Sequence, residues 1–236
     1  MRLLVVDWDT FFPVVEPPDT LWDLYDWGHN ENWGSGLQSM VWLDRAANFV
    51  RSQVPLPGLS GLQETFWQRF TFTANATLFV SESNFASMMP AVRRGIKEVA
   101  LFDAHHDGGY KERLGEHWNC ENWAVWYGLK GIPVHVYYPT WRTHVFETED
   151  SCLAETLGLP FHRQFDHGHP DPHSFDRIHV CRSGSWVPPW LDGAFQAFLE
   201  ACPAYCTLRT IGDVQPRTFD MQTVQEIVVM WQAVEA

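Results

Sequence analysis

The chain has 236 residues, of which 45% are hydrophobic and 13 are tryptophan, and its formal net charge is −13. This length suits one large α/β domain, residues 1–236, and the apolar content excludes a disordered chain. The negative charge argues against general nucleic-acid binding, which needs lysine and arginine to neutralise phosphates. We expect a small-molecule substrate as the partner; the composition does not indicate an oligomeric state.

The cysteines and the apolar segments bear on location. The cysteines are odd in number and form no Cys-x-x-Cys pair, which predicts reduced thiols in a cytoplasmic protein. The initial apolar run, residues 1–6, is too short for a signal peptide, and no stretch approaches the ~20 apolar residues of a membrane span. We therefore expect no membrane partner.

The first predicted strand is buried and ends in acidic residues. Residues 3–6 are a run of four apolar side chains, typical of a strand buried on both faces of a parallel sheet, and Asp7 and Asp9 follow it. Three interpretations of these aspartates stay open. They can complete a metal site shared with another strand end, or they can cap the next segment. The third is phosphoryl transfer, because the pair is similar to the haloacid dehalogenase phosphatase motif, although Thr10 falls one residue early.

A loop, two helices and a strand are predicted next. Residues 13–36 are rich in proline, tryptophan and aspartate, and we expect a long loop that either roofs a pocket or is anchored only structurally by its aromatic residues. Apolar spacing predicts a helix over about 35–50 and a strand over 76–80. A short helix over 88–94 is expected to close at Gly95.

The strand predicted over 99–102 carries the densest group of candidate ligands. Asp103, His105, His106 and Asp107 follow it, and then a glycine pair. Ligands of open α/β sheets bind beyond the carboxyl ends of strands, and an extended backbone would project Asp103, His105 and Asp107 from one side. Carboxylate oxygen and imidazole nitrogen are donors that a hard or borderline divalent cation takes. The sequence therefore predicts a metal site here.

The segment 103–107 (Asp-Ala-His-His-Asp) resembles the Asp-Ala-His-x-Asp motif of the arginase/deacetylase superfamily. The resemblance implies a three-layer α/β/α fold with a mainly parallel sheet, a divalent metal such as Mn²⁺ or Zn²⁺, and hydrolysis of a C–N bond in a guanidino, amidine or amide group. Two features depart from the family. Its Asp-x-Asp pair follows the motif, whereas Asp7 and Asp9 precede it. Ser83 stands where a histidine ligand is expected, which implies a weakened or single metal site, a donor from elsewhere, or a site that binds without hydrolysis.

The interpretation assigns a role to each candidate residue. The implied metal ligands are Asp7, Asp9, Asp103, His105 and Asp107. His106 is expected to donate a hydrogen bond to a metal ligand or to shuttle protons. Glu121 is a candidate general base, although an acidic residue at the start of a helix can also serve only to interact favourably with the helix dipole. Two other functions stay open: a phosphoryl-transfer enzyme with Asp7 as nucleophile and Asp9 as acid and base, and a non-catalytic binding protein on a degenerate hydrolase scaffold.

The remaining chain continues the alternation of helix and strand. The elements expected are helices over 121–129 and 190–201, strands over 134–138, 178–181 and 208–211, and a last helix that Asp220 caps. With the earlier runs this gives about six to eight strands in a mainly parallel sheet. Residues 166–173 hold three histidines and two aspartates, which can bind transition metals, but proline and glycine indicate a surface loop.

Overall fold

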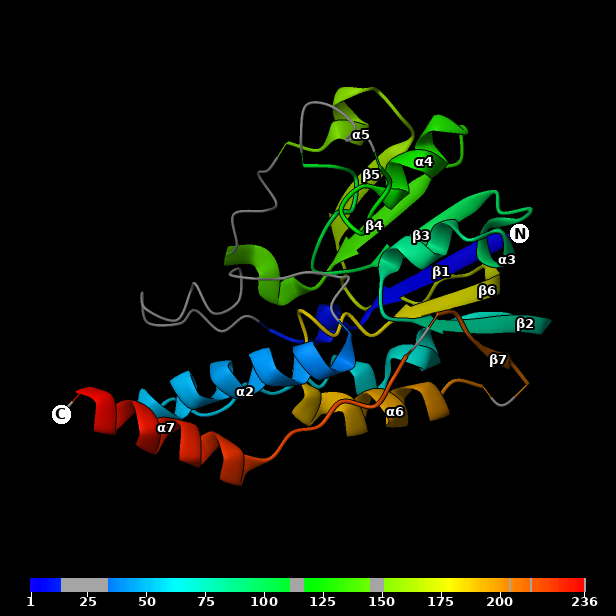
Figure 1. Cartoon of the computed structure of the whole chain (residues 1–236). Coiled ribbons are helices and arrows are strands. Elements are labelled where there is room, and N and C mark those ends of the chain that lie inside the picture. The colour runs from blue at the N-terminus through cyan, green and yellow to red at the C-terminus, as the bar shows by residue number, and fades with distance from the viewer. Residues whose placement is uncertain (14–33, 111–116, 145–150, 204, 213, 236) are drawn as a thin grey trace.

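Seven parallel strands form one sheet in the order β5-β4-β3-β1-β6-β2-β7, with β1 at its centre (Figure 1). The computed structural model describes residues 1–13, 34–110, 117–144, 151–203, 205–212 and 214–235. The strands are β1 (Arg2–Asp7), β2 (Thr71–Ser81), β3 (Glu98–Phe102), β4 (Val134–Tyr138), β5 (Phe161–Phe165), β6 (Ser174–Cys181) and β7 (Thr207–Thr210).

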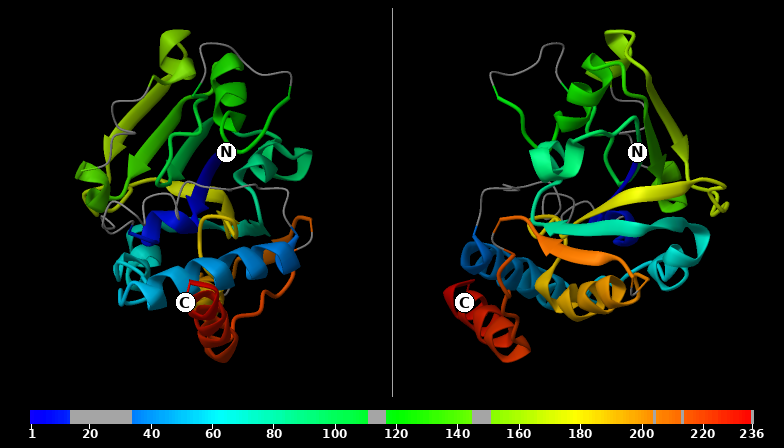
Figure 2. Two further views of the ribbon diagram at one scale, coloured as in Figure 1. Left: turned by 60° about the vertical axis from the view of Figure 1, so that its left-hand side comes forward. Right: turned by 90° about the vertical axis from the view of Figure 1, so that its right-hand side faces the viewer.

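Helices cover both faces of this sheet (Figures 1 and 2). One face packs against α2 and α6, with α7 lying on α2, and the other packs against α3, α4 and α5. Because side chains alternate along a strand, Leu4 and Val6 belong to the first core and Leu3 and Val5 to the second. The α-helices are α2 (Ser35–Arg51), α3 (Pro90–Arg93), α4 (Trp123–Leu129), α5 (Leu153–Thr156), α6 (Asp192–Glu200) and α7 (Met221–Glu235). The described chain is thus a three-layer α/β/α structure, and the predicted fold class is confirmed at that level.

Short 3-10 helices connect several of these elements. They are η1 (Trp8–Phe11), η2 (Leu62–Glu64), η3 (Phe66–Arg69), η4 (Asn84–Met88), η5 (Thr140–His144) and η7 (Pro189–Leu191). Three of them closely follow the end of a strand: η1 follows β1, η4 follows β2 and η5 follows β4. Each therefore carries polar residues at the carboxyl edge of the sheet.

Most predicted elements are present with shifted ends. The buried runs at 3–6, 99–102 and 134–138 are strands, and Asp220 caps α7 by accepting the backbone N–H groups of Gln222 and Thr223. The strand predicted over 76–80 is longer and begins at Thr71. Strand β5 was not predicted from the sequence. The loop expected to roof the pocket lies almost wholly in 14–33, outside the described residues.

Two further findings concern the general properties of the chain. None of the five cysteines, Cys120, Cys152, Cys181, Cys202 and Cys206, forms a disulfide bond. Among the described helices, none combines the length and apolar character that a membrane span requires.

Candidate metal centre

The candidate site lies where the central strands β1 and β3 end. These strands are parallel neighbours in which Val6 pairs with Phe102, so Asp7 and Asp103 leave the sheet side by side. On the other side of β1, Asp7 pairs with Cys181 at the end of β6. The carboxyl edge of an open parallel sheet therefore gathers aspartates from segments far apart in the chain.

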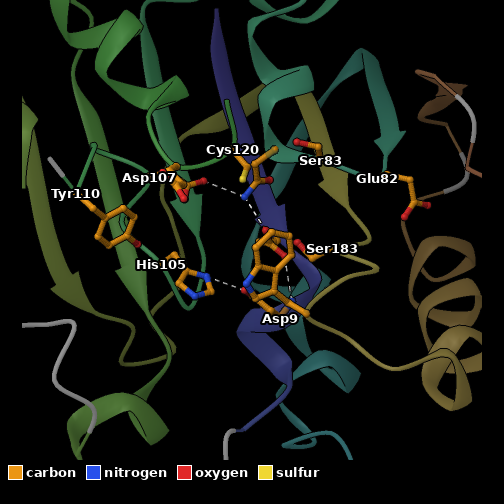
Figure 3. Close-up of a pocket in the computed structure, with 12 residues that line it drawn as sticks. Asp9, Glu82, Ser83, His105, Asp107, Tyr110, Cys120 and Ser183 are labelled. Carbon is orange, nitrogen blue, oxygen red and sulfur yellow. Dashed lines mark hydrogen bonds and ion pairs between the residues drawn. The ribbon is translucent and has the colours of Figure 1, made fainter. Parts of the chain in front are cut away.

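Asp9, Asp103 and His105 form the tightest group of possible ligands. One ligand atom from each lies within 4.8 Å of the others. Nδ1 of His105 is 2.8 Å from Oδ2 of Asp9 and 3.5 Å from Oδ1 of Asp103, and Figure 3 shows the contact with Asp9. Two carboxylates and one imidazole are a donor set that a borderline divalent cation accepts, so this group can hold a metal ion.

Asp7, Asp103 and Asp107 meet at a second point, the side-chain amide of Asn84. Nδ2 of Asn84 lies 2.6, 2.9 and 3.1 Å from an Oδ2 atom of Asp7, Asp103 and Asp107, respectively. Ser183 also donates its hydroxyl to Oδ2 of Asp7 at 2.6 Å. The three carboxylates therefore accept hydrogen bonds from neutral donors, namely the amide of Asn84 and the hydroxyl of Ser183.

Backbone amides hold Asp9, which belongs to the first group, and Asp7, which belongs to the second. Oδ1 of Asp9 accepts the N–H of Ala104 at 3.1 Å, and Oδ1 of Asp7 accepts the N–H of Asp9 at the start of η1. The expectation that these acids cap the following segment is therefore met by Asp7. A capping bond and a place in the site are compatible, because each carboxylate has two oxygens.

The loop after β3 brings its side chains together by turning rather than by extending. Asp107 has φ of 52°, in the left-handed region, so the predicted extended backbone from Asp103 to Asp107 is wrong. The indole of Trp123 in α4 donates to Oδ2 of Asp107 and fixes it. Gly108 follows against Cys152 and Phe161, where a Cβ atom would lie 2.5 Å from Sγ of Cys152. Close packing on this side thus forces the loop back toward β1.

The four aspartates are buried without a basic partner of fixed charge. Their exposed fractions are 4% for Asp7, 5% for Asp9, 0% for Asp103 and 5% for Asp107. In the part of the chain that the structure describes, their only ion pairs are those of Asp9 and Asp103 with His105. Burial of like charges at this density is costly unless protons or a cation compensate it.

The pKa values show how the group shares its charge. Burial, and then the charge of a neighbouring aspartate, raises the pKa of Asp7 and of Asp103 well above the ordinary value. Burial raises the pKa of Asp107 to about 7, against the opposing effects of His105 and Trp123. Burial also opposes ionisation of Asp9, but His105, the N–H of Ala104 and the side chain of Asp103 together outweigh it and lower the pKa of Asp9. Without a cation, negative charge therefore concentrates on Asp9.

A pocket of about 250 Å³ opens onto this group (Figure 3). Asp7, Asp9, Asn84, His105 and Asp107 line its base, while Asp103 lies fully buried behind them. The other lining residues are Glu82, Ser83, Tyr110, Cys120, Glu121, Ser183 and Trp186. The pocket is therefore acidic, with two aromatic side chains in its wall.

The two residues predicted to move protons lie differently. Glu121 is exposed and lines the pocket just before α4. His106 is fully buried, accepts the N–H of Gly108 at Nδ1, and stacks on Tyr110 with ring centroids 4.0 Å apart. It lies beside the pocket wall, so within this structure it supports the loop and Tyr110.

Three residues that contact the aspartates were not predicted from the sequence: Asn84, Ser183 and Trp123. Asn84 and Ser183 follow the ends of β2 and β6, so the strand-end argument that found Asp7 and Asp103 could have found them too. Ser83, where a histidine was expected, accepts the N–H of Phe85 and so caps η4. Trp123 had no distinguishing signal, because a tryptophan in a helix is usually part of the core.

The histidine-rich segment 166–173 lies away from this site. It lines a separate hollow of about 370 Å³ with Arg2 and Arg69. Arg69 pairs with Asp166, and Arg2 pairs with Asp171, which holds the segment against the sheet. Among the described residues, the group at Asp9 is the one set of three or more side chains spaced to hold a metal.

Searches with protein-family models, against curated proteins and against solved structures found no match to this chain. The fold and the site therefore define an α/β protein with a buried aspartate and histidine group at the carboxyl edge of a parallel sheet.

Proposed function

We propose that the protein is a metal-dependent hydrolase that acts on a C–N bond of guanidino, amidine or amide type, similar to the arginase/deacetylase superfamily. The observation that carries the proposal is the convergence of four buried aspartates and His105 at the base of a pocket. The Asp-Ala-His-x-Asp motif and the Asp-x-Asp pair meet there because β1 lies beside β3, although their order along the chain differs from that of the family.

The donor chemistry fits a divalent cation. Asp9, Asp103 and His105 would hold it, with Asp7 and Asp107 adding negative charge behind. Oxygen donors with one imidazole suit Mn²⁺, and Zn²⁺ is the second choice. A bound cation of this kind would act as a Lewis acid and would lower the pKa of a bound water molecule toward neutral pH.

The chain itself would bind the substrate and move protons. Tyr110 and Trp186 form walls on which a planar guanidino, amidine or amide group can lie, and the pocket volume limits the substrate to a small group or a side-chain end. Glu121 is exposed in the pocket wall and is the residue available to take a proton from water. The indole of Trp123 and the amide of Asn84 keep Asp107 and Asp7 in place.

Phosphoryl transfer from Asp7 is less well supported. A nucleophilic carboxylate needs an oxygen free to attack, yet Oδ1 of Asp7 accepts the N–H of Asp9 and Oδ2 accepts Asn84 and Ser183. The alternative of a non-catalytic binding protein on the same scaffold can be distinguished from the hydrolase by measuring bound metal and substrate turnover.

The test combines metal analysis with a substrate panel. The untagged protein is stripped with a chelator and reloaded with Mn²⁺ or Zn²⁺. Release of ammonia, urea or amine is then followed over small amides, amidines and guanidines. We expect stoichiometric metal and turnover that are both lost in Asp103→Ala and Asp9→Ala, while Asp44→Ala on the exposed surface of α2 retains them. Metal without turnover of any compound would favour the binding protein. Absence of metal under every loading condition would remove the hydrolase proposal.

A further inference from the structure

We infer that Asn84 limits the site to one cation, because its side-chain amide occupies the place where a second ion would be held. This inference rests on the proposed function, since it assumes that the aspartate group binds a metal. It concerns the number of ions and the residue that sets it.

The two carboxylate oxygens of Asp103 face two possible metal positions. The first place lies beside Asp9 and His105, and the second place lies at the amide of Asn84. Oδ1 of Asp103 faces the group that Asp9 and His105 complete, at 3.5 Å from Nδ1 of His105. Its Oδ2 faces the amide of Asn84 at 2.9 Å, together with one oxygen each of Asp7 and Asp107. A bridging carboxylate of this kind could serve two ions, so the contents of each place decide the stoichiometry.

The second place is filled by a neutral donor. An ion bound to the three Oδ2 atoms would lie about 2.0–2.2 Å from each of them. Nδ2 of Asn84, at 2.6–3.1 Å from the same atoms, already takes up that position. Ser183 and Trp123 donate to the outer two of these oxygens as well. The three carboxylates are thus solvated by protein donors in place of a cation.

Among the described residues, the first place has no neutral side-chain donor of this kind. Apart from the ring of His105 and the hydrogen bond between the two carboxyl groups, the bonds to Asp9 and Asp103 on this side come from the backbone amides of Ala104 and His105. Oδ2 of Asp9 faces Nδ1 of His105 directly, and both residues line the open pocket. An ion that replaces the proton between them gains both donors and an oxygen of Asp103.

Asn84 is also held too firmly to swing aside. It is 2% exposed and is the first residue of η4. The buried ring of His179 bonds Ser81 at 2.7 Å and Ser87 at 2.6 Å, so it ties both ends of the turn that carries Asn84. Tyr127 donates to the carbonyl of Ser87 at 2.8 Å. The amide is therefore a built part of the site.

Manganese stoichiometry and electron paramagnetic resonance test this inference without reference to turnover. The full chain is stripped with a chelator, loaded with Mn²⁺ and freed of excess metal, and manganese per chain is measured. Mn²⁺ is chosen because histidine-rich segments such as 166–173 hold it more weakly than Zn²⁺ or Cu²⁺. We expect one ion per chain, with the spectrum of an isolated Mn²⁺.

Asn84→Asp is the decisive variant, since it replaces the neutral donor by a fourth carboxylate at the second place. We expect two ions per chain and a spectrum of coupled Mn²⁺, whereas Asn48→Asp, the same change in α2, keeps one ion. His105→Ala covers the case in which Asn84→Asp does not fold. It should lose the single ion, and an ion retained there would show that the second place binds metal in the presence of Asn84.

The outcomes separate this inference from the proposed function. Two ions in the unaltered protein would overturn the role of Asn84 and leave the metal-dependent hydrolase standing. No ion in the unaltered protein under any loading would overturn both. One ion in the unaltered protein and still only one in a folded Asn84→Asp would also overturn the role of Asn84.

Discussion

Asp9 and His105 face each other across the junction of β1 and β3, with Nδ1 of His105 2.8 Å from Oδ2 of Asp9. The two residues are far apart in the chain and meet because the strands that precede them are parallel neighbours with Val6 opposite Phe102. His105, and then the N–H of Ala104 and the side chain of Asp103, lower the pKa of Asp9 against the effect of burial, while burial raises the pKa of the other three aspartates. A cation that binds at this contact therefore competes with the proton between Nδ1 of His105 and Oδ2 of Asp9.

Removal of one buried carboxylate should stabilise the metal-free protein. Asp103→Asn keeps the shape of a fully buried side chain and replaces a carboxyl group whose ionisation is opposed by burial and by the three other aspartates. We expect the free energy of unfolding in chelator at pH 8 to rise by about 1–2 kcal/mol, while metal binding is lost. Urea denaturation measures the first and metal analysis the second. Asp44→Asn is the matched control on the exposed surface of α2, and an equal gain there would contradict the explanation.

The stability of the metal-free protein should fall as pH rises. The folded pKa of Asp107 is about 7, above the ordinary value for aspartate of about 3.9, so the folded state holds more protons than the unfolded state between these values. Its contribution is present at pH 4 and is lost as pH rises toward 7, with a slope of at most about 1.4 kcal/mol per pH unit. Urea titrations of the unaltered protein at pH 5, 6, 7 and 8 with chelator measure this.

Asp107→Asn isolates that residue. Asparagine tolerates the left-handed backbone at this position, where φ is 52°, so the substitution adds no new backbone strain. The difference in unfolding free energy between the two proteins should grow in favour of the Asp107→Asn variant as pH rises through 7. A difference independent of pH between 5 and 8 would show that Asp107 is ionised throughout in the folded state.

The buried strands and their aspartates could be predicted because they leave a strong local signal. The four apolar residues of 3–6 and 99–102 each stop at an aspartate, and the parallel-sheet rule predicts that such ends share an edge. In contrast, β5 has the sequence Phe-His-Arg-Gln-Phe and lies at the edge of the sheet, where alternate residues are exposed. Its polar content hides it from a search for apolar runs.

The donors around the aspartates could not be predicted in the same way. Asn84 reads as an ordinary turn residue, and its contacts depend on β2 and β1 lying on either side of β6. That strand order has no local signal. The left-handed turn at Asp107 depends in turn on the packing of Gly108 against Cys152 and Phe161, which are distant in sequence. The residue types were visible, and the tertiary contacts that give them their roles were not.

His179 should be needed for the stability of the turn that carries Asn84. Its ring is fully buried between the hydroxyls of Ser81 and Ser87. His179→Ala removes one hydrogen bond from each hydroxyl in an enclosed space, and Ser81 keeps only its bond to the carbonyl of Ser83. We expect a loss of about 2–4 kcal/mol in unfolding free energy at pH 7.5. His162→Ala, on an exposed residue of β5, should cost much less. Equal losses would contradict the role given to this histidine.

The contribution of His179 to the stability of the folded protein should depend on pH in the opposite direction to that of Asp107. Burial lowers the pKa of His179 to about 3, below the ordinary value of about 6.5, so it is neutral when folded. Its contribution is present above pH 6.5 and is lost as pH falls toward 3. His179→Gln removes the titrating group, so the difference in stability between the unaltered protein and His179→Gln should narrow below pH 6. A constant difference from pH 4 to 7.5 would be inconsistent with a neutral buried ring.

Arg69 should anchor the histidine-rich segment 166–173 independently of the metal centre. Its guanidinium contacts both oxygens of Asp166, at 2.7 and 2.5 Å, and lies 5.3 Å from the ring centroids of Phe70 and Phe102. A lysine ammonium reproduces the charge but neither the contact with both oxygens of Asp166 nor the area of the guanidinium beside the two rings. Arg69→Lys should therefore lose most of the stability that Arg69→Ala loses, about 1–3 kcal/mol.

A double-mutant cycle with Asp166→Ala separates the ion pair from the ring contacts. We expect a coupling energy of about 1–2 kcal/mol between Arg69 and Asp166, because both side chains are largely buried. All members of the cycle should keep the manganese stoichiometry of the unaltered protein, since Arg69 and Asp166 line a different hollow from the aspartate group. Loss of manganese in Arg69→Ala with the fold intact would instead mean that this segment supports the metal centre.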